Sequence, residues 1–259
     1  MCVVAALAGC GRGPGLIATS PAAARAAAAS RGPPRNGLEV VAWMRRAYPS
    51  RELRSLTFTV RSVRYANDTT PAESRVSALL PGRIRVEAIP VTSRTGTVRD
   101  RQRLAVFRAG HRVTRVDRVD LRTLLAYDVF AQGVDTTIMW LDSARVRFGL
   151  VRRDDFDGRP VWVVGADDGD MNSAQFWVDA ERWHVVRVIQ REPRLPAIVS
   201  DVRFTDFTEL LGVPVPTRME VWREGKLFEQ QSYSDFTVNP SLSRRAFDLS
   251  KWYATSLSN

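Results

Sequence analysis

The sequence predicts a mainly β protein with a few helices, in which consecutive strands form an antiparallel sheet. Residues 156–239 hold a series of strand-length apolar runs that are rich in β-branched and aromatic residues, a composition typical of strands. Each run ends at a cluster of Gly, Asp or Pro, and Asp157-Gly158 is a strong signal for a two-residue hairpin. Because no helix-length pattern separates these strands, of which there are at least six, their sheet is expected to be antiparallel.

The N-terminus begins with a short apolar run. Residues 3–10 are too few to cross a bilayer as a helix, and they end in small residues and a cysteine. The sequence Leu7-Ala8-Gly9-Cys10 resembles the lipobox of bacterial lipoproteins. This resemblance implies a signal peptide over residues 1–10, cleavage before Cys10 and acyl chains on that cysteine, which would anchor the protein at a membrane surface. No basic residue precedes the run, and an ordinary signal peptide cleaved within 22–29 or a chance Ala-rich start are the alternatives.

The next segment differs in composition from the rest of the chain. Residues 11–36 are rich in Ala, Gly, Pro, Ser and Arg without a periodic apolar pattern, which predicts a flexible tether. Cys2 and Cys10 are the only cysteines, so the region beyond the signal segment has neither a disulfide nor a thiol. We therefore expect a single domain over residues 37–259 that is held together by its apolar core.

The charge of the chain comes almost wholly from arginine. The formal net charge is +10, and Lys226 and Lys251 are the only lysines. Solvated strand faces are the simplest interpretation, and attraction to anionic lipid or another polyanion is the alternative. Many arginines fall within 83–118, but the sequence has no recognised nucleic-acid-binding motif. Nucleic acid is therefore not an expected partner.

The predicted domain starts with a helix and a strand. Asn36 and Glu39 have the spacing of a capped helix start. Apolar residues then recur at helical spacing until Pro49 ends the helix. Alternating apolar residues over 56–65 predict a half-buried strand, and a slip in the alternation predicts a bulge near Ser62.

More strands and two short helices fill the middle of the chain. Alternating patterns predict further strands at 75–80, 83–91, 103–107 and 112–116. The spacing then becomes helical over 120–132 and 135–141. Asp120 and Asp135 are the expected N-caps, and Gly133 separates the two helices.

Four segments carry a resemblance to a known family, and they are FDGRPVW (156–162), FWVD (176–179), VVRV (185–188) and FDL (247–249). They resemble segments of the LolA/LolB-like superfamily of periplasmic lipoprotein carriers. The predicted order of helix, strands, short helices and further strands agrees with this resemblance, which covers roughly residues 38–249. The resemblance implies a curved antiparallel sheet that forms an open, incomplete β-barrel capped by helices. It also implies an apolar cavity that takes acyl chains of lipoproteins or other lipids.

A cavity is also expected on physical grounds. A curved sheet without a second sheet against it leaves its concave face apolar, and three short helices are too few to fill that face tightly. Burying an acyl chain is favourable by about 0.8 kcal/mol per methylene. The candidate lipid-binding residues share one parity of the strands or lie on the first helix, and they are Trp43, Phe58, Val60, Ile84, Val86, Phe176, Val178, Val186, Val188, Phe204, Met219 and Val221. An ordinary place in the core is the alternative for each.

The sequence gives little indication of catalysis. It has no G-x-S-x-G elbow, P-loop or G-x-G-x-x-G motif, so neither an enzyme nor a cofactor is expected. His111 and His184 have no Cys, Asp or second His at metal-ligand spacing. Asp167, Asp168 and Asp170 cluster where a turn is needed, so a solvated turn is the favoured interpretation and a Ca²⁺ site the alternative.

The expected function is therefore that of a bacterial envelope protein, periplasmic or anchored through Cys10, that binds acyl chains for lipoprotein sorting or lipid transfer. Its expected partners are lipid or lipoprotein acyl chains and the membrane surface. The alternative is a regulatory or structural module on the same fold, of the envelope-stress sensor type, with an envelope protein as its partner.

Overall fold

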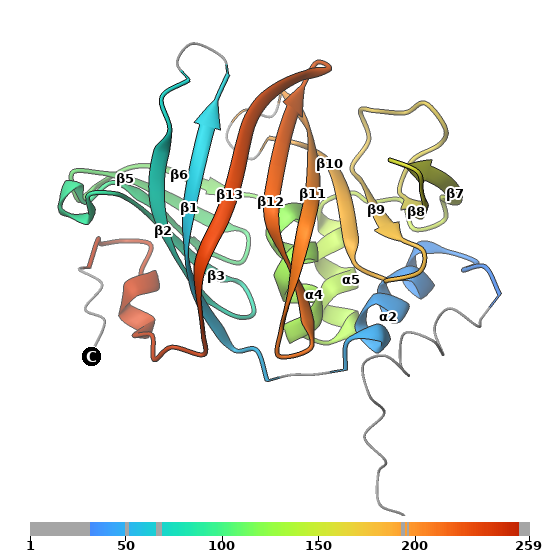
Figure 1. The fold of residues 1–259 in the computed structure, drawn as a ribbon, viewed down its shortest axis with the longest axis horizontal. Coiled ribbons are helices and arrows are strands. Elements are labelled where there is room, and N and C mark those ends of the chain that lie inside the picture. The colour runs from blue at the N-terminus through green and yellow to red at the C-terminus, as the bar shows by residue number, and fades with distance from the viewer. Residues whose placement is uncertain (1–31, 50–51, 66–68, 193–194, 196, 254–259) are drawn as a thin grey trace, which may run out of the picture.

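One curved antiparallel sheet organises the molecule (Figure 1). The computed structural model describes residues 32–49, 52–65, 69–192, 195 and 197–253. The thirteen strands of this region are ordered across the sheet as β6 (His111–Asp117), β5 (Arg103–Arg108), β4 (Gly96–Asp100), β3 (Arg83–Ala88), β2 (Ala72–Leu79), β1 (Ser55–Arg64), β13 (Lys226–Val238), β12 (Val213–Arg223), β11 (Val199–Leu210), β10 (Val185–Arg191), β9 (Gln175–Asp179), β8 (Arg159–Val164) and β7 (Val151–Phe156). Because β6 and β7 are separate edges, the barrel is open, and the predicted mainly β fold is confirmed.

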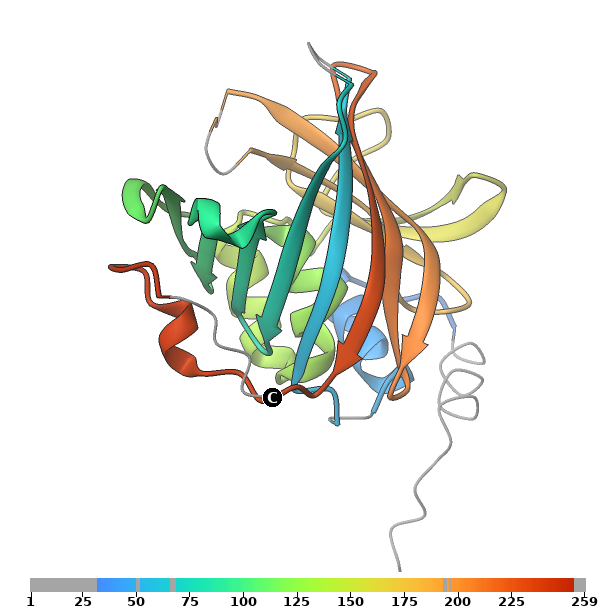
Figure 2. The same ribbon diagram turned by 60° about the vertical axis from the view of Figure 1, so that its left-hand side comes forward.

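The helices lie inside the curve of the sheet (Figure 2). They are α2 (Gly37–Ala47), α3 (Leu121–Thr123), the π-helix η2 (Leu124–Asp128), α4 (Val129–Ala131) and α5 (Val134–Ser143). Two short 3₁₀ helices, η1 (Val91–Ser93) and η3 (Arg244–Phe247), complete the described elements. Within the described part of the chain, no helix combines the length and the apolar character that crossing a membrane requires.

Helix α2 forms where the capping signal predicts it. The Asn36 side chain accepts a hydrogen bond from the Glu39 backbone N–H at 3.0 Å, which satisfies one of the free donors at a helix start. The Glu39 carboxylate turns outward and bonds Arg35. Val40 and Met44 are fully buried, so one face of α2 packs into the core.

The segment between β6 and β7 is helical, and its caps differ in part from the prediction. Asp120 caps α3 by accepting a hydrogen bond from the Arg122 backbone N–H at 3.1 Å, as expected. The prediction of Asp135 as a cap is wrong, because Gly133 is the N-cap residue of α5 and Asp135 lies in its first turn. In that first turn the carboxylate is still close to the positive end of the helix dipole.

The tight turns of the second half follow their sequence signals. Asp157 and Gly158 have φ values of 53° and 74°, the two positive angles that a type I′ hairpin requires. Asp179 accepts hydrogen bonds from the backbone N–H groups of Glu181 and Arg182 at 2.9 and 2.8 Å. These side-chain bonds fix the β9–β10 connection as expected for an Asp-initiated turn.

Two predictions in the first half are wrong. Strand β4 was not expected, because its sequence GTVRD has one apolar residue and therefore no alternating pattern. No bulge occurs at Ser62, which pairs in regular register with Ala72. The irregularity of β1 lies instead opposite β13, between Thr57 and Thr59, where the partner strand carries the extra residue.

The C-terminal segment crosses the outer face of the sheet, where it packs on β4 and β5. Phe247 and Trp252 form a small core there with Val98 and Phe107. The fully buried Arg85 side chain donates hydrogen bonds to the carbonyl oxygens of Ala246 and Tyr253 at 2.8 and 2.7 Å. It also pairs with Glu87 at 2.8 Å and lies 3.7 Å from the centre of the Trp252 ring. This one cation therefore ties the C-terminal segment to the sheet.

Candidate functional site

Most of the residues predicted to bind lipid belong to the main core between the concave face and the helices. The fully or nearly buried members of this core are Trp43, Phe58, Val60, Phe176, Val178, Val188, Phe204, Met219 and Val221. Ile84 and Val86 are partly buried against the same core. These alternate side chains therefore point from the sheet toward the helices, as the sequence predicted.

Val186 lies on the other face. It packs with Val161, Val163 and Trp177 in a separate outer cluster. The register of β10 against β9 shifts between Val185 and Arg187, and such an extra residue inverts which side chains face the core. The prediction that Val186 faces the core is therefore wrong, because it assumed strict alternation from Val188 and did not include this extra residue.

The interior is packed at the place where the sequence predicted a cavity. Trp43 contacts Trp183 edge-on, with ring centres 4.9 Å apart. Phe58 stacks on Tyr127 of η2 at 6.5 Å, and Leu124 is only 4% exposed. The helices thus fill the concave face near Trp43 and Leu124 with their own side chains, and the space for a ligand lies elsewhere.

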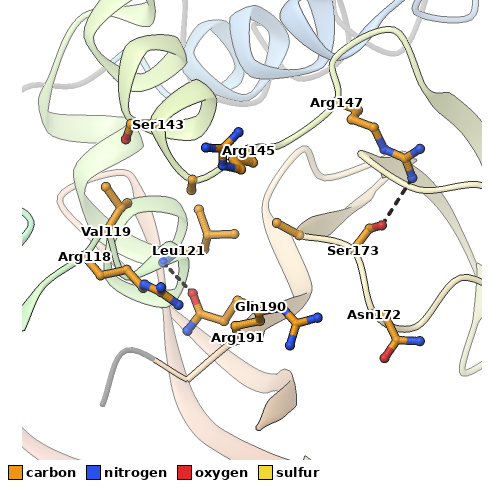
Figure 3. A pocket seen from close by; sticks show the side chains of 12 residues that line it. Arg118, Val119, Leu121, Ser143, Arg145, Arg147, Asn172, Ser173, Gln190 and Arg191 are labelled. Atoms are coloured by element: carbon orange, nitrogen blue, oxygen red, sulfur yellow. Dashed lines mark hydrogen bonds between the residues drawn. The ribbon is translucent and has the colours of Figure 1, made fainter. Parts of the chain in front are cut away.

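An open cavity of about 620 Å³ lies at the end of this core (Figure 3). Four segments that are distant in the sequence form its walls: the β6–α3 connection, the C-terminal end of α5 with the residues that follow it, the residues before β9, and the end of β10. Its size lies within the range of roughly 300–1,000 Å³ that is typical of small-molecule sites.

The floor of this cavity is apolar and continuous with the main core. Leu121 is 1% exposed and is a member of that core. Val119, Ala144 and Ala174 also line the cavity and are partly buried against the core. A hydrocarbon group on this floor would therefore contact side chains that already exclude water.

The rim of the cavity is basic. Arg118, Arg145, Arg147 and Arg191 line it, and each is exposed to solvent. Figure 3 shows them around the opening, with Arg145 and Arg147 on the segment after α5 and Arg118 and Arg191 on two other segments. Among the described residues that line the cavity there is no carboxylate. The cavity thus combines an apolar floor with a positively charged rim.

The arginines of the rim differ in their partners. Arg147 donates hydrogen bonds to the Ser173 hydroxyl at 3.3 Å and to the Asp170 carboxylate at 3.2 Å, which holds it against the loop before β9. For Arg118 and Arg145, no described residue forms a hydrogen bond or ion pair with the guanidinium group. These two cations are therefore available to an anionic ligand.

A buried ionic cluster fixes the wall that carries Arg118 and Leu121. The Asp120 carboxylate accepts hydrogen bonds from the Arg122 guanidinium at 2.9 Å and from the Gln190 amide at 3.2 Å, and Arg99 pairs with it at 3.4 Å. Gln190 also accepts a hydrogen bond from the Leu121 backbone N–H at 2.9 Å. Burial alone would raise the pKa of Asp120, but Arg122 and Arg99 outweigh burial and hold this pKa well below its usual range. A charged Asp120 thus joins α3 to β10.

A second buried carboxyl group lies at the end of η2. Asp128 accepts a hydrogen bond from the Gly82 backbone N–H at 2.8 Å. Burial raises the pKa of Asp128 to about 7, and the Gly82 bond and the charges of Arg99 and Arg101 limit this rise. The helical segment is therefore joined to the β2–β3 turn through a group that titrates near neutral pH.

The acidic cluster in the sequence forms a loop that faces arginines. Asp170 caps the backbone N–H groups of Asn172 and Ser173 at 2.9 and 3.0 Å. Asp167 lies 3.8 Å from Arg147, and Asp168 lies 3.6 Å from Arg152. Across the part of the chain that the structure describes, no group of three or more His, Cys, Asp or Glu side chains is arranged to hold a metal ion.

The two histidines lie far apart in different settings. His111 is exposed at the start of the edge strand β6. His184 is 3% exposed and packs against Phe207, with ring centres 4.0 Å apart and the ring planes tilted by 33°. The structure therefore does not bring them together into one site.

Sequence reasoning missed the cavity as a site. Its arginines lie at positions 118, 145, 147 and 191, and no motif joins them. The concentration of arginines over 83–118 pointed to a basic face but not to its partner segments. Residues 143–147 contain no acidic residue, but nothing in the sequence connects this segment with the other walls of the cavity.

Comparison with known proteins identifies the fold. No protein-family model matches the sequence, and no curated protein matches it. A LolA superfamily protein from Nitrosomonas europaea superposes with a TM-score of 0.52 at 14% identity, over 82% of this chain and 97% of that one. An outer membrane lipoprotein-sorting protein domain from Vibrio parahaemolyticus gives 0.51 at 13% identity, over 82% and 96%. A DUF1329 family protein from Desulfovibrio piger gives 0.51 at 14% identity, over 82% and 95%. The chain therefore has a LolA-like fold.

Proposed function

We propose that this protein binds acyl chains of lipids or lipoproteins in the bacterial envelope, for lipoprotein sorting or lipid transfer. The observation that carries the proposal is the cavity whose apolar floor continues into the core while its rim is basic. An amphiphile fits such a site because its chain and its headgroup need these two environments. The lipoprotein-sorting description of a protein with the same fold supports the same class of ligand. A binding protein of this kind needs neither a catalytic group nor a cofactor.

Movement of helix α5 could connect the floor of the cavity with the main core. Among the residues of α5, only Thr137 and Leu141 are buried, whereas Met139 is 53% exposed. Elements with few buried apolar contacts open at low free-energy cost. A small outward movement of α5 would extend the floor at Ala144 into the main core. Burial of each methylene is favourable by about 0.8 kcal/mol, so the first few carbons of a chain would already offset part of the free-energy cost of that movement.

The proposed location is the periplasmic side of the cell envelope. Cys10, the predicted lipidation site, lies outside the described residues, as do the predicted signal peptide and residues 11–31 of the predicted tether. Lipidation there would make the protein an acceptor fixed at a membrane surface, and its absence would make it a soluble carrier. Both forms use the same cavity.

Native mass spectrometry of gently purified protein tests the proposal. We expect adducts whose masses match acyl lipids, and organic extraction should release the same lipids. Ala174→Trp, which fills the floor of the cavity, should remove the adducts, and Ala144→Trp on another wall serves as a second variant. Ala72→Trp, at an exposed position of β2, is the control that keeps them. Wild-type protein that is free of lipid, both as purified and after incubation with envelope lipids, would contradict the proposal.

A further inference from the structure

The cavity holds a feature that acyl-chain binding alone does not require. Four arginines from three separate segments converge on one opening. A hydrocarbon chain gains nothing from a guanidinium group, and like charges that share one cavity repel one another. A site with this rim is therefore complementary to a ligand that carries negative charge.

We infer that the cavity selects amphiphiles with a phosphate headgroup, which Arg118 and Arg145 bind at the rim while Val119, Leu121 and Ala174 contact the first part of the chain. This inference rests on the proposed function, because it names the headgroup of the ligand that the same cavity takes.

The number and arrangement of guanidinium donors at the rim favour a phosphate ligand over a carboxylate ligand. A guanidinium group offers a planar set of donors that matches two oxygens of a phosphate, and the negative charge of a phosphate is spread over several oxygens. A carboxylate has only two oxygens, so hydrogen bonds from two arginines already use both of them and leave no oxygen for the other cations of the rim. A phosphate monoester provides three terminal oxygens and a charge near −2 at neutral pH. It can therefore engage Arg118 and Arg145 together and still interact with the other cations of the rim.

The partners of the rim residues support the same assignment. Arg118 and Arg145 have guanidinium groups without a hydrogen bond or ion pair to any described residue, so a ligand need not displace an internal carboxylate. Arg147, in contrast, is held by Asp170 and Ser173 at one side of the cavity. The wall that carries Arg118 is fixed by the buried Asp120 cluster. Two free cations, one of them on a wall that this cluster fixes, form a partly preorganised site for an anion.

Binding of soluble short-chain probes tests the inference by isothermal titration calorimetry. The probes are dioctanoyl phosphatidic acid, dioctanoylglycerol, which has the same chains without phosphate, and glycerol 3-phosphate, which has the phosphate without chains. The phosphatidic acid should bind at least about tenfold more tightly than dioctanoylglycerol, as expected for charge-assisted hydrogen bonds. This preference should weaken as the NaCl concentration rises.

The double variant Arg118→Gln/Arg145→Gln should lose the preference for phosphatidic acid and keep the affinity for dioctanoylglycerol. The matched control is Arg61→Gln/Arg159→Gln, which removes the same charge from exposed positions on β1 and β8. The control should retain the preference, and unchanged thermal unfolding should show that both double variants are folded.

The other outcomes separate this inference from the proposed function. If dioctanoylglycerol and phosphatidic acid bind equally, the inference is overturned and acyl-chain binding stands. If glycerol 3-phosphate binds as tightly as phosphatidic acid, the anion site stands and the acyl-chain proposal fails. If no probe binds the folded protein, both are overturned. A preference that persists in the Arg118→Gln/Arg145→Gln variant would also overturn the inference, because the selectivity would then come from other residues.

Discussion

The Arg187 guanidinium on β10 donates two hydrogen bonds to the Asp201 carboxylate on β11, at 2.7 and 2.8 Å. The same guanidinium group lies 4.3 Å from the centre of the Trp177 ring on β9. Arg203 donates to Asp201 at 3.0 Å and lies 4.4 Å from the Trp222 ring on β12. One carboxylate thus joins two cations that cover aromatic rings across four neighbouring strands. This network shields the apolar outer face of the curved sheet from water.

Removal of Asp201 should destabilise the protein strongly. Asp201→Ala leaves two arginines without their carboxylate, and the loss of one partner of a largely buried pair lowers the free energy of unfolding by about 3 kcal/mol. The control is Asp117→Ala, which breaks the exposed Arg115–Asp117 pair on β6 and should cost no more than about 1 kcal/mol. Urea unfolding measures both values. Equal effects of the two substitutions would contradict the role given to the outer-face network.

Stability should depend on pH through Asp128, whose pKa is raised to about 7 by burial. The ordinary pKa of an aspartate is about 4, so between these values the folded state keeps a proton that the unfolded state has released. The free energy of unfolding should therefore fall as pH rises from about 4 to 7, with a slope approaching roughly 1.4 kcal/mol per pH unit, and level off above that window. The contribution of Asp128 therefore makes the protein least stable above about pH 7, where the carboxyl group is ionised in both the folded and the unfolded state.

Asp128→Asn isolates this contribution, because its side-chain oxygen can still accept the Gly82 hydrogen bond. The variant should be more stable than the wild type at pH 8, and this advantage should shrink toward pH 5. Denaturant unfolding at several pH values gives the difference directly. A difference that stays constant from pH 5 to pH 8 would show that Asp128 is ionised in the folded protein at all of these values.

Arg85 should hold the C-terminal segment on the sheet. Arg85→Met keeps the volume but removes the hydrogen bonds to Ala246 and Tyr253 and the charge above Trp252. Because the buried ion pair between Arg85 and Glu87 is then broken, we expect a loss of about 3 kcal/mol in the free energy of unfolding. Hydrogen exchange over 244–253 should become faster in the variant while exchange in β11 and β12 stays slow. Unchanged protection over 244–253 would refute this role of Arg85.

Cys10 should decide whether the protein is found at a membrane. In the native host, wild-type protein should fractionate with membranes and dissolve in detergent, since multiple acyl chains anchor stably. Cys10→Ser should move it to the soluble fraction, while Cys2→Ser should not. If Cys10→Ser stays with the membranes to the same extent as the wild type, the lipobox prediction is wrong.

The elements that the sequence predicts well are those with a local physical cause. The Asp157-Gly158 turn requires two positive φ angles, and Gly permits one at no cost. Asn36 and Asp120 cap helices through their own short side chains. These signals need no knowledge of distant residues, so the mainly antiparallel order of the second half follows from them.

The elements that the sequence does not predict depend on neighbouring strands. Strand β4 has too few apolar residues to show alternation, and it forms because β3 and β5 supply its hydrogen bonds on both sides. Val186 changes faces because of a bulge against β9 that no residue type marks. The cavity depends on the meeting of segments near residues 118, 145, 173 and 190, which only the folded chain brings together.

Photocrosslinking with a diazirine-labelled fatty acid tests most directly whether this cavity takes an acyl chain. Peptide mapping of the labelled protein should place the crosslinks within 118–121, 143–147, 172–174 and 190–191, the segments that line the cavity. An unlabelled fatty acid should compete for this labelling, and Ala174→Trp should abolish it. Labelling confined to the outer face, or labelling that neither the competitor nor Ala174→Trp reduces, would contradict the account.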